Sequence, residues 1–549
     1  MQTRGWRSTW TRAREKFSLL PASPLQPGMS QRMLDNCHHH PKISLVVPVF
    51  RPRLVWLERC LRSVRNQHYP VWELVVVDDG SRSDRVSRTI ESHAAADERI
   101  AAHVLPENEG IAAATNVALE RCSGEFVGFL DHDDMLTPDA LTWIAAAHNR
   151  FPDAVWFYSD EAKTTPNGMI YDVVCKPRFA PELLLSTMYT CHFSVYATSA
   201  LRELTGVRRG FDAAQDHDLA LRMSEHVDLT QVVHIPQVLY YWRAGKGSTA
   251  SSITAKPHAP AAGRRAVREA LARRQIRANV RSSSEHPTVY ELTLKPSSRP
   301  PVDLLTHVAG QLVAPTEAAL RRLMVDEYGH CSVAEFGQMY GGQSMASGPP
   351  ANATPRAART GSHWSRLSGA LEAILAVNGG EYIALVDVTC TPLAADWLAQ
   401  LVATCELDRK IAAAGCLWLD DDGRVDNAGY ACWENRVVAL GRGEQFASGG
   451  YCARFHGLHD IPAVSPGLML VRRSALATAE WLPSGHEEHA FAMTICSALR
   501  DAGHRVVLNP VVRASRDSLG RSHQPAALPM RRRGQPYGLP SSPKSIWAE

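Results

Sequence analysis

The sequence predicts an α/β protein of two units, the first built on a mainly parallel central sheet. Short, continuously apolar runs end abruptly in acidic residues, as strands that are buried on both faces do. These runs alternate with segments whose apolar residues recur at helical spacing. A stretch of the second half also matches one of the first, and 549 residues are too many for one compact core. We therefore expect two tandem units.

The first predicted strand is the run 43–48, which ends in a proline. A helix follows over 54–64, where leucines and a valine form one stripe. The next apolar run, 74–77, stops at Asp78 and Asp79, which precede a glycine. Because ligands of open parallel sheets bind at the carboxyl ends of the strands, these two acids are candidates to contact a nucleobase or a ribose. An ordinary Asp-Gly turn is the alternative.

A second group of acids follows the predicted strand 124–130 and consists of Asp131, Asp133 and Asp134. Asp131 and Asp133 are two residues apart, so both carboxylates point into one space if the extended conformation persists. Such oxygen ligands suit Mg²⁺ or Mn²⁺ bridging a diphosphate. The alternative is a solvated acidic loop, which we disfavour because three acids at the end of an apolar strand repel one another unless a cation offsets their charge.

A third acidic group, Asp216 and Asp218, begins a predicted helix. Acids at a helix start can simply satisfy backbone N–H groups, and for Asp218 this interpretation is as strong as a functional one. Asp216 is the better candidate for a general base, because no other acid of this segment is placed to face the two earlier groups.

These motifs, in this order, resemble those of the inverting family 2 glycosyltransferases with the GT-A fold, especially bacterial enzymes that build O-antigen, rhamnan and related surface polysaccharides. The resemblance covers about 200 residues. The motifs that carry it are Pro48-Val49-Phe50, Asp78-Asp79-Gly80-Ser81, Asn108-Glu109-Gly110-Ile111, Leu130-Asp131-His132-Asp133-Asp134, Tyr158-Ser159-Asp160-Glu161, Lys176-Pro177, Gln215-Asp216-His217-Asp218 and Tyr240-Tyr241-Trp242-Arg243.

The resemblance implies transfer of a sugar from a nucleotide-diphosphate donor to a hydroxyl of a glycan or lipid-linked acceptor, in surface polysaccharide and lipopolysaccharide synthesis. It implies Mn²⁺ or Mg²⁺ held by Asp131 and Asp133, with Asp216 as the catalytic base of one inverting displacement. A non-catalytic scaffold for polysaccharide assembly is the alternative. The residues that the resemblance places at the substrates are Pro48, Phe50, Asp78, Asp79, Asn108, Gly110, Asn116, Asp131, Trp242 and Arg243.

The sequence departs from the family pattern in two places that concern the site. Gly245 stands where many members carry a histidine after the Trp-Arg pair, which weakens the case for a protein imidazole from that position in the metal shell. Arg178 and Phe179 follow Lys176-Pro177 where many relatives have Asp and Trp, which puts the donor or acceptor preference in doubt.

The second half carries a degenerate copy of the acidic strand end. Residues 380–389 align with 124–133, so that Asp387 lies opposite Asp131 but Thr389 lies opposite Asp133. This predicts poor binding of divalent cations, and Ala492 aligned with Asp216 predicts loss of the base. We expect a degenerate GT-A-like domain that serves as a structural partner or an acceptor-binding surface, with a second active transferase as the alternative.

The predicted division is a partly disordered basic leader at 1–41, a catalytic domain at 42–295, a linker and degenerate region at 296–365, a degenerate domain at 366–525 and a disordered tail at 526–549. The leader mixes Trp6 and Trp10 with arginines, and peripheral contact with the inner face of the cell membrane is the alternative to a leader without fixed structure.

Composition narrows the partners and the compartment. A formal net charge of +3 argues against a nucleic-acid-binding surface. The 12 cysteines are scattered without metal or disulfide spacing, which predicts reduced thiols in the cytoplasm. No apolar run reaches the length of a transmembrane helix.

Overall fold

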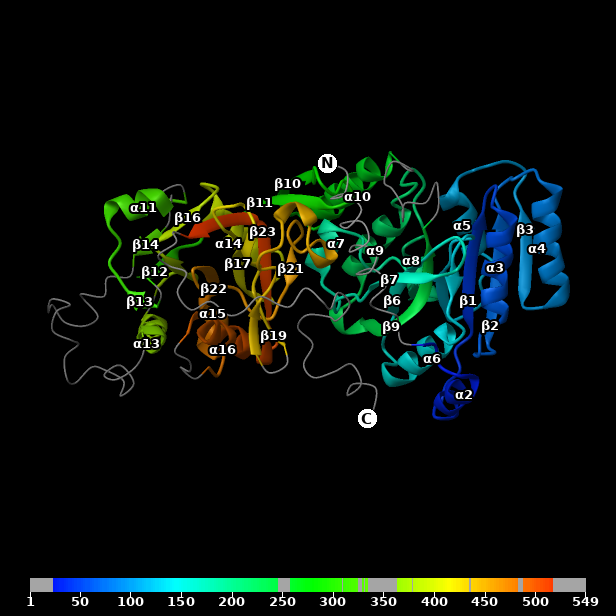
Figure 1. The fold of residues 1–549 in the computed structure, drawn as a ribbon, viewed down its shortest axis with the longest axis horizontal. Coiled ribbons are helices and arrows are strands. Elements are labelled where there is room, and N and C mark those ends of the chain that lie inside the picture. The colour runs from blue at the N-terminus through cyan, green and yellow to red at the C-terminus, as the bar shows by residue number, and fades with distance from the viewer. Residues whose placement is uncertain are drawn as a thin grey trace, which may run out of the picture. The chain divides into compact units, whose positions relative to one another are not determined.

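The computed structural model describes residues 23–244, 257–308, 310–323, 328–329, 331–333, 363–377, 379–433, 436–481 and 487–516. These residues form two compact units, which divide between Ala270 and Leu271. Each unit is built on one large mixed sheet with helices packed against it (Figure 1). The predicted α/β class with two units is confirmed.

The sheet of the first unit has the strand order β3-β2-β1-β4-β8-β6-β9-β5, with β7 paired to β6. Its strands are β1 (Ile43–Val49), β2 (Trp72–Asp78), β3 (Ile100–Val104), β4 (Phe126–Phe129), β5 (Met135–Leu136), β6 (Trp156–Thr164), β7 (Ile170–Val174), β8 (Ser194–Ala197) and β9 (Val232–Arg243). Its helices are α2 (Pro27–Asp35), α3 (Leu54–Arg65), α4 (Asp84–Ala96), α5 (Ile111–Leu119), α6 (Ala140–Arg150), α7 (Pro181–Ser186), α8 (Thr198–Glu203) and α9 (Gln215–His226), and α10 (Ala259–Arg273) spans the division between the units.

The parallel core of this sheet places the predicted acids at one edge. β1 pairs in parallel with β2 on one side and with β4 on the other. Residue Val49 lies opposite Asp78, the last residue of β2, and Asp131 follows shortly after β4. Because parallel strands end at the same edge, the two acidic groups converge there.

The sheet of the second unit has the order β13-β12-β15-β22-β17-β23-β16, with β14, β18 and β21 paired at its sides. Its strands are β12 (Val302–Val308), β13 (Gln311–Leu312), β14 (Cys331–Val333), β15 (Tyr382–Asp387), β16 (Cys390–Pro392), β17 (Ile411–Leu419), β18 (Val425–Asn427), β21 (His459–Asp460), β22 (Leu468–Arg472) and β23 (Arg505–Arg516). The second unit also contains two hairpins, β10 (Arg277–Ser282) with β11 (Tyr290–Lys295) and β19 (Tyr430–Trp433) with β20 (Arg436–Ala439). Its helices are α11 (Glu317–Leu323), α13 (His363–Leu375), α14 (Trp397–Glu406), α15 (Arg473–Thr478) and α16 (Glu488–Asp501).

The second sheet repeats the topology of the first over six strands. The order β1-β4-β8-β6-β9-β5 corresponds to β12-β15-β22-β17-β23-β16, and each neighbouring pair is parallel or antiparallel alike in both sheets. The helix after β8 also has its counterpart in the helix after β22. The likeness between the two halves, predicted from one sequence match, therefore extends to six strands of the two central sheets.

The structure places two segments differently from the predicted division. β12 is an inner strand of the second sheet, although it lies within the range 296–365 that was expected to be a linker and degenerate region. The β10–β11 hairpin belongs to the second unit, because β11 packs against α14 and β23.

Several sequence predictions lie outside the described residues. These are the leader up to residue 22, the segment 334–362 and the tail from 517. Among the helices that are described, none combines the length and the apolar character needed to span a bilayer.

Candidate active site

Three side chains that can bind a metal meet at the carboxyl end of β4. Asp131, Asp134 and His192 each offer one ligand atom, and these atoms lie within 4.8 Å of one another. The acids come from the loop after β4, and His192 comes from the segment that leads into β8. Sequence reasoning missed His192, because no spacing links it to acids that lie some sixty residues earlier in the chain.

The predicted pairing of Asp131 with Asp133 depended on an extended chain, and the chain turns instead. The Asp134 backbone N–H donates to the Asp131 carbonyl oxygen at 3.0 Å, which closes a turn over these residues. The alternation of an extended strand is lost in such a turn. Asp134 joins Asp131 in the described cluster, and Asp133 is not one of its three members.

The end of β9 holds the acidic loop in place. The Tyr240 hydroxyl donates to Asp134 Oδ2 at 2.6 Å, and the Arg243 backbone N–H donates to Asp134 Oδ1 at 2.7 Å. Arg243 Nε donates to the Asp133 carbonyl oxygen at 2.6 Å, and the Arg243 side chain is fully buried. Arg243, which the resemblance placed at the substrate, therefore forms part of the wall that supports the loop.

The electrostatics of this loop suit a cation. Burial, reinforced by the charges of Asp133 and Asp131, raises the pKa of Asp134 well above its usual range. Crowded carboxylates of this kind repel one another unless a positive charge lies between them. Two carboxylates and one imidazole can provide ligands for a divalent metal, and each Asp134 oxygen keeps a second lone pair beside its hydrogen bond.

Asp78 and Asp79 are both buried but have different surroundings. Asp79 binds the loop before α5: Asn108 Nδ2 donates to its Oδ2 at 2.8 Å, and the backbone N–H groups of Glu109 and Gly110 donate to the two oxygens at 2.7 and 3.0 Å. Asp78 Oδ1 accepts from the Ser81 backbone N–H at 3.1 Å, whereas its buried Oδ2 has no hydrogen-bond partner among the described residues. An unsatisfied buried acceptor at a strand end suits a donor group of a bound nucleoside.

Replacing Asp79 with asparagine should destabilise the first unit, whereas Asp78→Asn should chiefly weaken nucleotide binding. Asp79→Asn removes charge-assisted bonds to backbone N–H groups, and we expect a loss of about 2–3 kcal/mol in the free energy of unfolding. Asp78→Asn turns the open acceptor into a donor, and we expect about a tenfold weaker affinity for nucleoside diphosphate. Urea unfolding measures the loss of stability, and calorimetric titration measures the affinity for nucleoside diphosphate. Equal losses of stability and of affinity in the two variants would contradict the different roles assigned to Asp78 and Asp79.

The remaining predicted substrate residues divide into accessible and engaged ones. Phe50 is 39% exposed just beyond β1, and the Arg51 guanidinium lies 5.2 Å from the centroid of its ring. The Pro48 carbonyl lies 3.2 Å from His132 Nδ1. The Trp242 ring lies 5.4 Å from the His192 ring, beside the acidic cluster. Asn116 donates to the Val207 carbonyl and accepts from its N–H, so both of its polar atoms bind backbone of the same unit.

The two acids that begin α9 also differ. Asp218 is fully buried and forms ion pairs with Arg208 and Arg222, which assigns it to the framework. Asp216 is partly exposed, and its charge contributes to raising the pKa of Cys191, whose principal cause is burial. Asp216 is thus close enough to the Cys191 thiol to affect its charge, and Cys191 directly precedes His192 in the chain.

Comparison with known proteins bears on this site. Residues 44–205 match the family described as Glycosyl transferase family 2, and the matched stretch contains both aspartate pairs and His192. The first unit carries a family 2 glycosyltransferase domain. The predicted family is confirmed, and Asp216 lies beyond the matched stretch in the same unit.

Two relatives show how far the similarity extends around the family 2 domain. The chain is 31% identical over 500 residues to an uncharacterised protein of Sinorhizobium fredii. That alignment covers 88% of this chain and 54% of the relative. It is also 35% identical over 296 residues to the O-antigen biosynthesis protein RfbC of Myxococcus xanthus. That alignment covers 54% of this chain and 22% of RfbC. The chain thus spans about half, or less, of the length of these relatives.

A solved structure matches part of this chain. The structure of S. aureus TarS in complex with UDP-GlcNAc has 21% sequence identity and a TM-score of 0.35, and the match covers 42% of this chain and 66% of that chain. The predicted GT-A fold of the first unit is confirmed by the family match together with its α/β sheet.

Proposed function

We propose that this protein is a metal-dependent, inverting glycosyltransferase that moves a sugar from a nucleotide-diphosphate donor to a hydroxyl of a glycan or lipid-linked acceptor in surface polysaccharide synthesis. One observation carries the proposal. Within a family 2 domain, the open acceptor of Asp78 and the Asp131–Asp134–His192 cluster lie at the carboxyl ends of neighbouring parallel strands. The name of the O-antigen relative supports the polysaccharide class.

The chain's residues have distinct roles in this proposal. Asp78 accepts a hydrogen bond from the nucleoside, and Phe50 stacks on its base. Asp131, Asp134 and His192 hold Mn²⁺ or Mg²⁺, and an imidazole among the ligands favours Mn²⁺. When bound, the metal supplies positive charge that offsets the charge developing on the leaving diphosphate.

Asp216 acts as the catalytic base. Its position at the start of α9, near His192, places a carboxylate beside the cluster rather than within it. It takes the proton from the acceptor hydroxyl as that oxygen attacks the anomeric carbon, and the diphosphate leaves on the opposite face. One such displacement inverts the anomeric configuration.

The proposal places the enzyme in the cytoplasm, with peripheral contact at the inner face of the membrane where lipid-linked acceptors are found. The 12 cysteines, all among the described residues, form no disulfide with one another, which agrees with a reducing compartment. Gly245 lies outside the described residues.

The experiment that tests the function is a panel of nucleotide sugars offered to the intact chain with Mn²⁺ or Mg²⁺, following release of nucleoside diphosphate. We expect metal-dependent release from one donor, accelerated by a bacterial glycan acceptor, with an inverted anomeric configuration in the product. No release from any donor, together with no metal-dependent nucleotide binding, would leave the scaffold interpretation standing.

The ligand set can be tested without measuring activity. Electron paramagnetic resonance of Mn²⁺ bound in the presence of nucleoside diphosphate should show about a tenfold lower affinity in His192→Gln, as loss of one metal ligand predicts. Asp133→Asn should change the affinity less, because Asp133 is outside the described cluster. A larger loss of Mn²⁺ affinity in Asp133→Asn than in His192→Gln would instead support Asp131 and Asp133 as the metal ligands.

A further inference from the structure

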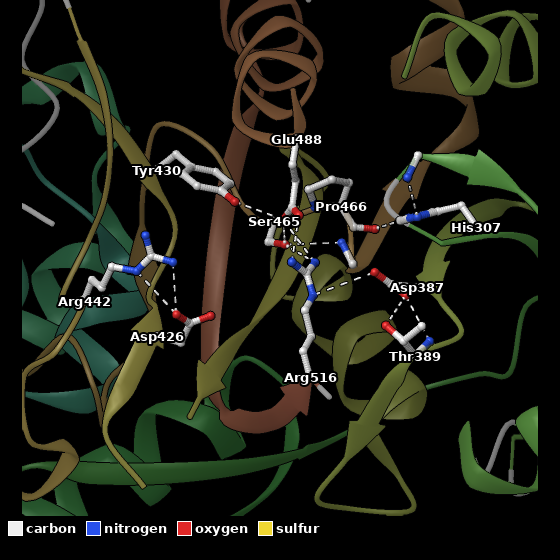
Figure 2. A network of polar contacts seen from close by, with 12 residues as sticks. His307, Asp387, Thr389, Asp426, Tyr430, Arg442, Ser465, Pro466, Glu488 and Arg516 are labelled. Atoms are coloured by element: carbon white, nitrogen blue, oxygen red, sulfur yellow. Dashed lines mark hydrogen bonds and ion pairs between the residues drawn. The ribbon is translucent and has the colours of Figure 1, made fainter. Parts of the chain in front are cut away.

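A buried arginine occupies the centre of the second unit. Arg516, at the end of β23, is 5% exposed. Its Nη1 and Nη2 donate to Glu488 Oε2 and Oε1 at 2.7 and 3.0 Å, and its Nε lies 3.9 Å from Asp387 Oδ2 (Figure 2). One guanidinium thus faces two carboxylates, from the end of β15 and from the first residue of α16.

Strand pairing shows where this arginine lies in the repeated sheet. Asp387 occupies the position of Asp131, since β15 repeats β4. Met135 lies opposite Tyr241 in the first sheet, and its counterpart Thr391 lies opposite Ser515 in the second. Arg516 therefore occupies the position of Trp242, beside the acidic strand end.

The start of α16 carries an acid where the sequence alignment expected none. α9 begins with Asp216 in its first turn, and α16 begins at Glu488, whereas Ala492 lies one turn further along and is buried. The predicted alignment of Ala492 with Asp216 stays a prediction. The first turn of α9 and the first turn of α16 each carry an acid.

The surroundings are shaped for the guanidinium. It lies 4.3 Å from the Trp418 ring, and a Cβ at Gly467 would collide with it and with that ring. Glu488 also accepts from the Ser465 and Tyr430 hydroxyls at 2.6 and 2.9 Å. Burial opposes ionisation of Glu488, but Arg516 and these hydroxyls outweigh it and lower its pKa to about 2.

Asp387 is satisfied on its other side. The Thr389 backbone N–H and hydroxyl both donate to Asp387 Oδ1, at 2.9 and 2.7 Å, which leaves Oδ2 facing Arg516. The threonine that replaces the second acid of the motif thus binds the first acid.

We propose that Arg516 is a resident cation that takes the place of a metal ion in the second unit, so that this unit binds no divalent cation while Arg516 is present. The comparison with a metal site rests on the proposed function of the first unit, but the charge balance of Arg516, Glu488 and Asp387 does not.

The test asks whether replacing Arg516 creates a cation site in the second unit. All variants also carry Asp131→Asn, which weakens the Asp131–Asp134–His192 cluster of the first unit. Tb³⁺ binds the oxygen ligands that suit Ca²⁺, and excitation of nearby Trp418 sensitises its emission. In the Asp131→Asn chain we expect no saturable emission that Asp387→Asn abolishes, and after Arg516→Ala we expect one additional site per chain. Adding Glu488→Gln to that variant should abolish the gained site, and Arg516→Lys should not create it.

Two results would overturn the proposal. One is saturable emission already present with Arg516 in place and lost in Asp387→Asn. The other is no gained site in a folded Arg516→Ala chain. Failure of the first unit to bind Mn²⁺ would contradict the proposed function alone, because the gained site is measured independently of it.

Stability provides a second measurement if Arg516→Ala does not fold. Removing one partner of a buried ion pair is strongly destabilising, whereas removing both charges together is much less so. We expect Arg516→Met to melt about 10 °C or more below the parent chain or to be insoluble, and Arg516→Met with Glu488→Gln to melt closer to the parent. A double variant no more stable than Arg516→Met, or a single variant as stable as the parent, would exclude mutual neutralisation.

Discussion

Replacing Asp131 with asparagine is expected to lower the rate of sugar transfer by about 10³-fold, because a bound metal contributes several kcal/mol of charge stabilisation to the transition state. Asparagine has nearly the same shape, and Asp131 is only partly buried, so the fold should persist. Steady-state rates at saturating donor and Mn²⁺, with melting temperatures as a check of folding, measure this effect.

The control is Asp153→Asn, which removes the same charge from an exposed position in the same unit. Its rate should equal that of the unchanged protein. If Asp131→Asn kept more than about a tenth of the rate, one or two kcal/mol at most would depend on this carboxylate, and the proposed metal site would be wrong.

The second large effect concerns two acids on one turn of α9. Asp216→Asn is expected to lower the rate by about 10²–10⁴-fold with little change in stability, because it removes the general base from a partly exposed position. Asp218→Asn is expected to destabilise the first unit by about 3–5 kcal/mol, because it leaves Arg208 and Arg222 without the buried charge that they bind.

The two asparagine variants control for each other, since each removes one carboxylate from the same helix start. Rates and urea unfolding measured on both should give opposite patterns. If Asp218→Asn lost activity but kept its stability, Asp218 would be the functional acid of this pair.

Asp218 also predicts acid sensitivity. Burial opposes its ionisation, but the two arginines outweigh burial and lower its pKa. A carboxylate whose pKa is lower in the folded state stabilises the fold above its unfolded pKa of about 3.9, and this stability is lost as pH falls through the folded value. Unfolding curves between neutral and acidic pH should therefore converge for the unchanged protein and Asp218→Asn.

Much of the fold could be predicted because strand and helix signals are local. The runs that became β1, β2 and β4 are apolar, and those of β2 and β4 end in acids, so the edge where Asp78 and Asp131 meet follows from the sequence. The duplicated strand end at Asp387 was equally visible. The extent of the duplication was not, because β12 and the start of α16 have little sequence likeness to their counterparts.

The sequence by itself determined which acids stand at strand ends and helix starts, and hence the class of the protein and the location of its site. Only the tertiary structure decided which of these acids are engaged by the protein itself. Asp79 binds a loop, Asp218 binds two arginines and Asp134 accepts hydrogen bonds from the end of β9. The partners of Asp79 and Asp134 lie far away in the chain, whereas both arginines that bind Asp218 lie close to it in sequence. Arg516 also meets Glu488 and Asp387 through the fold, so pairing in space rather than the spacing of the acids alone sets the role of each charge.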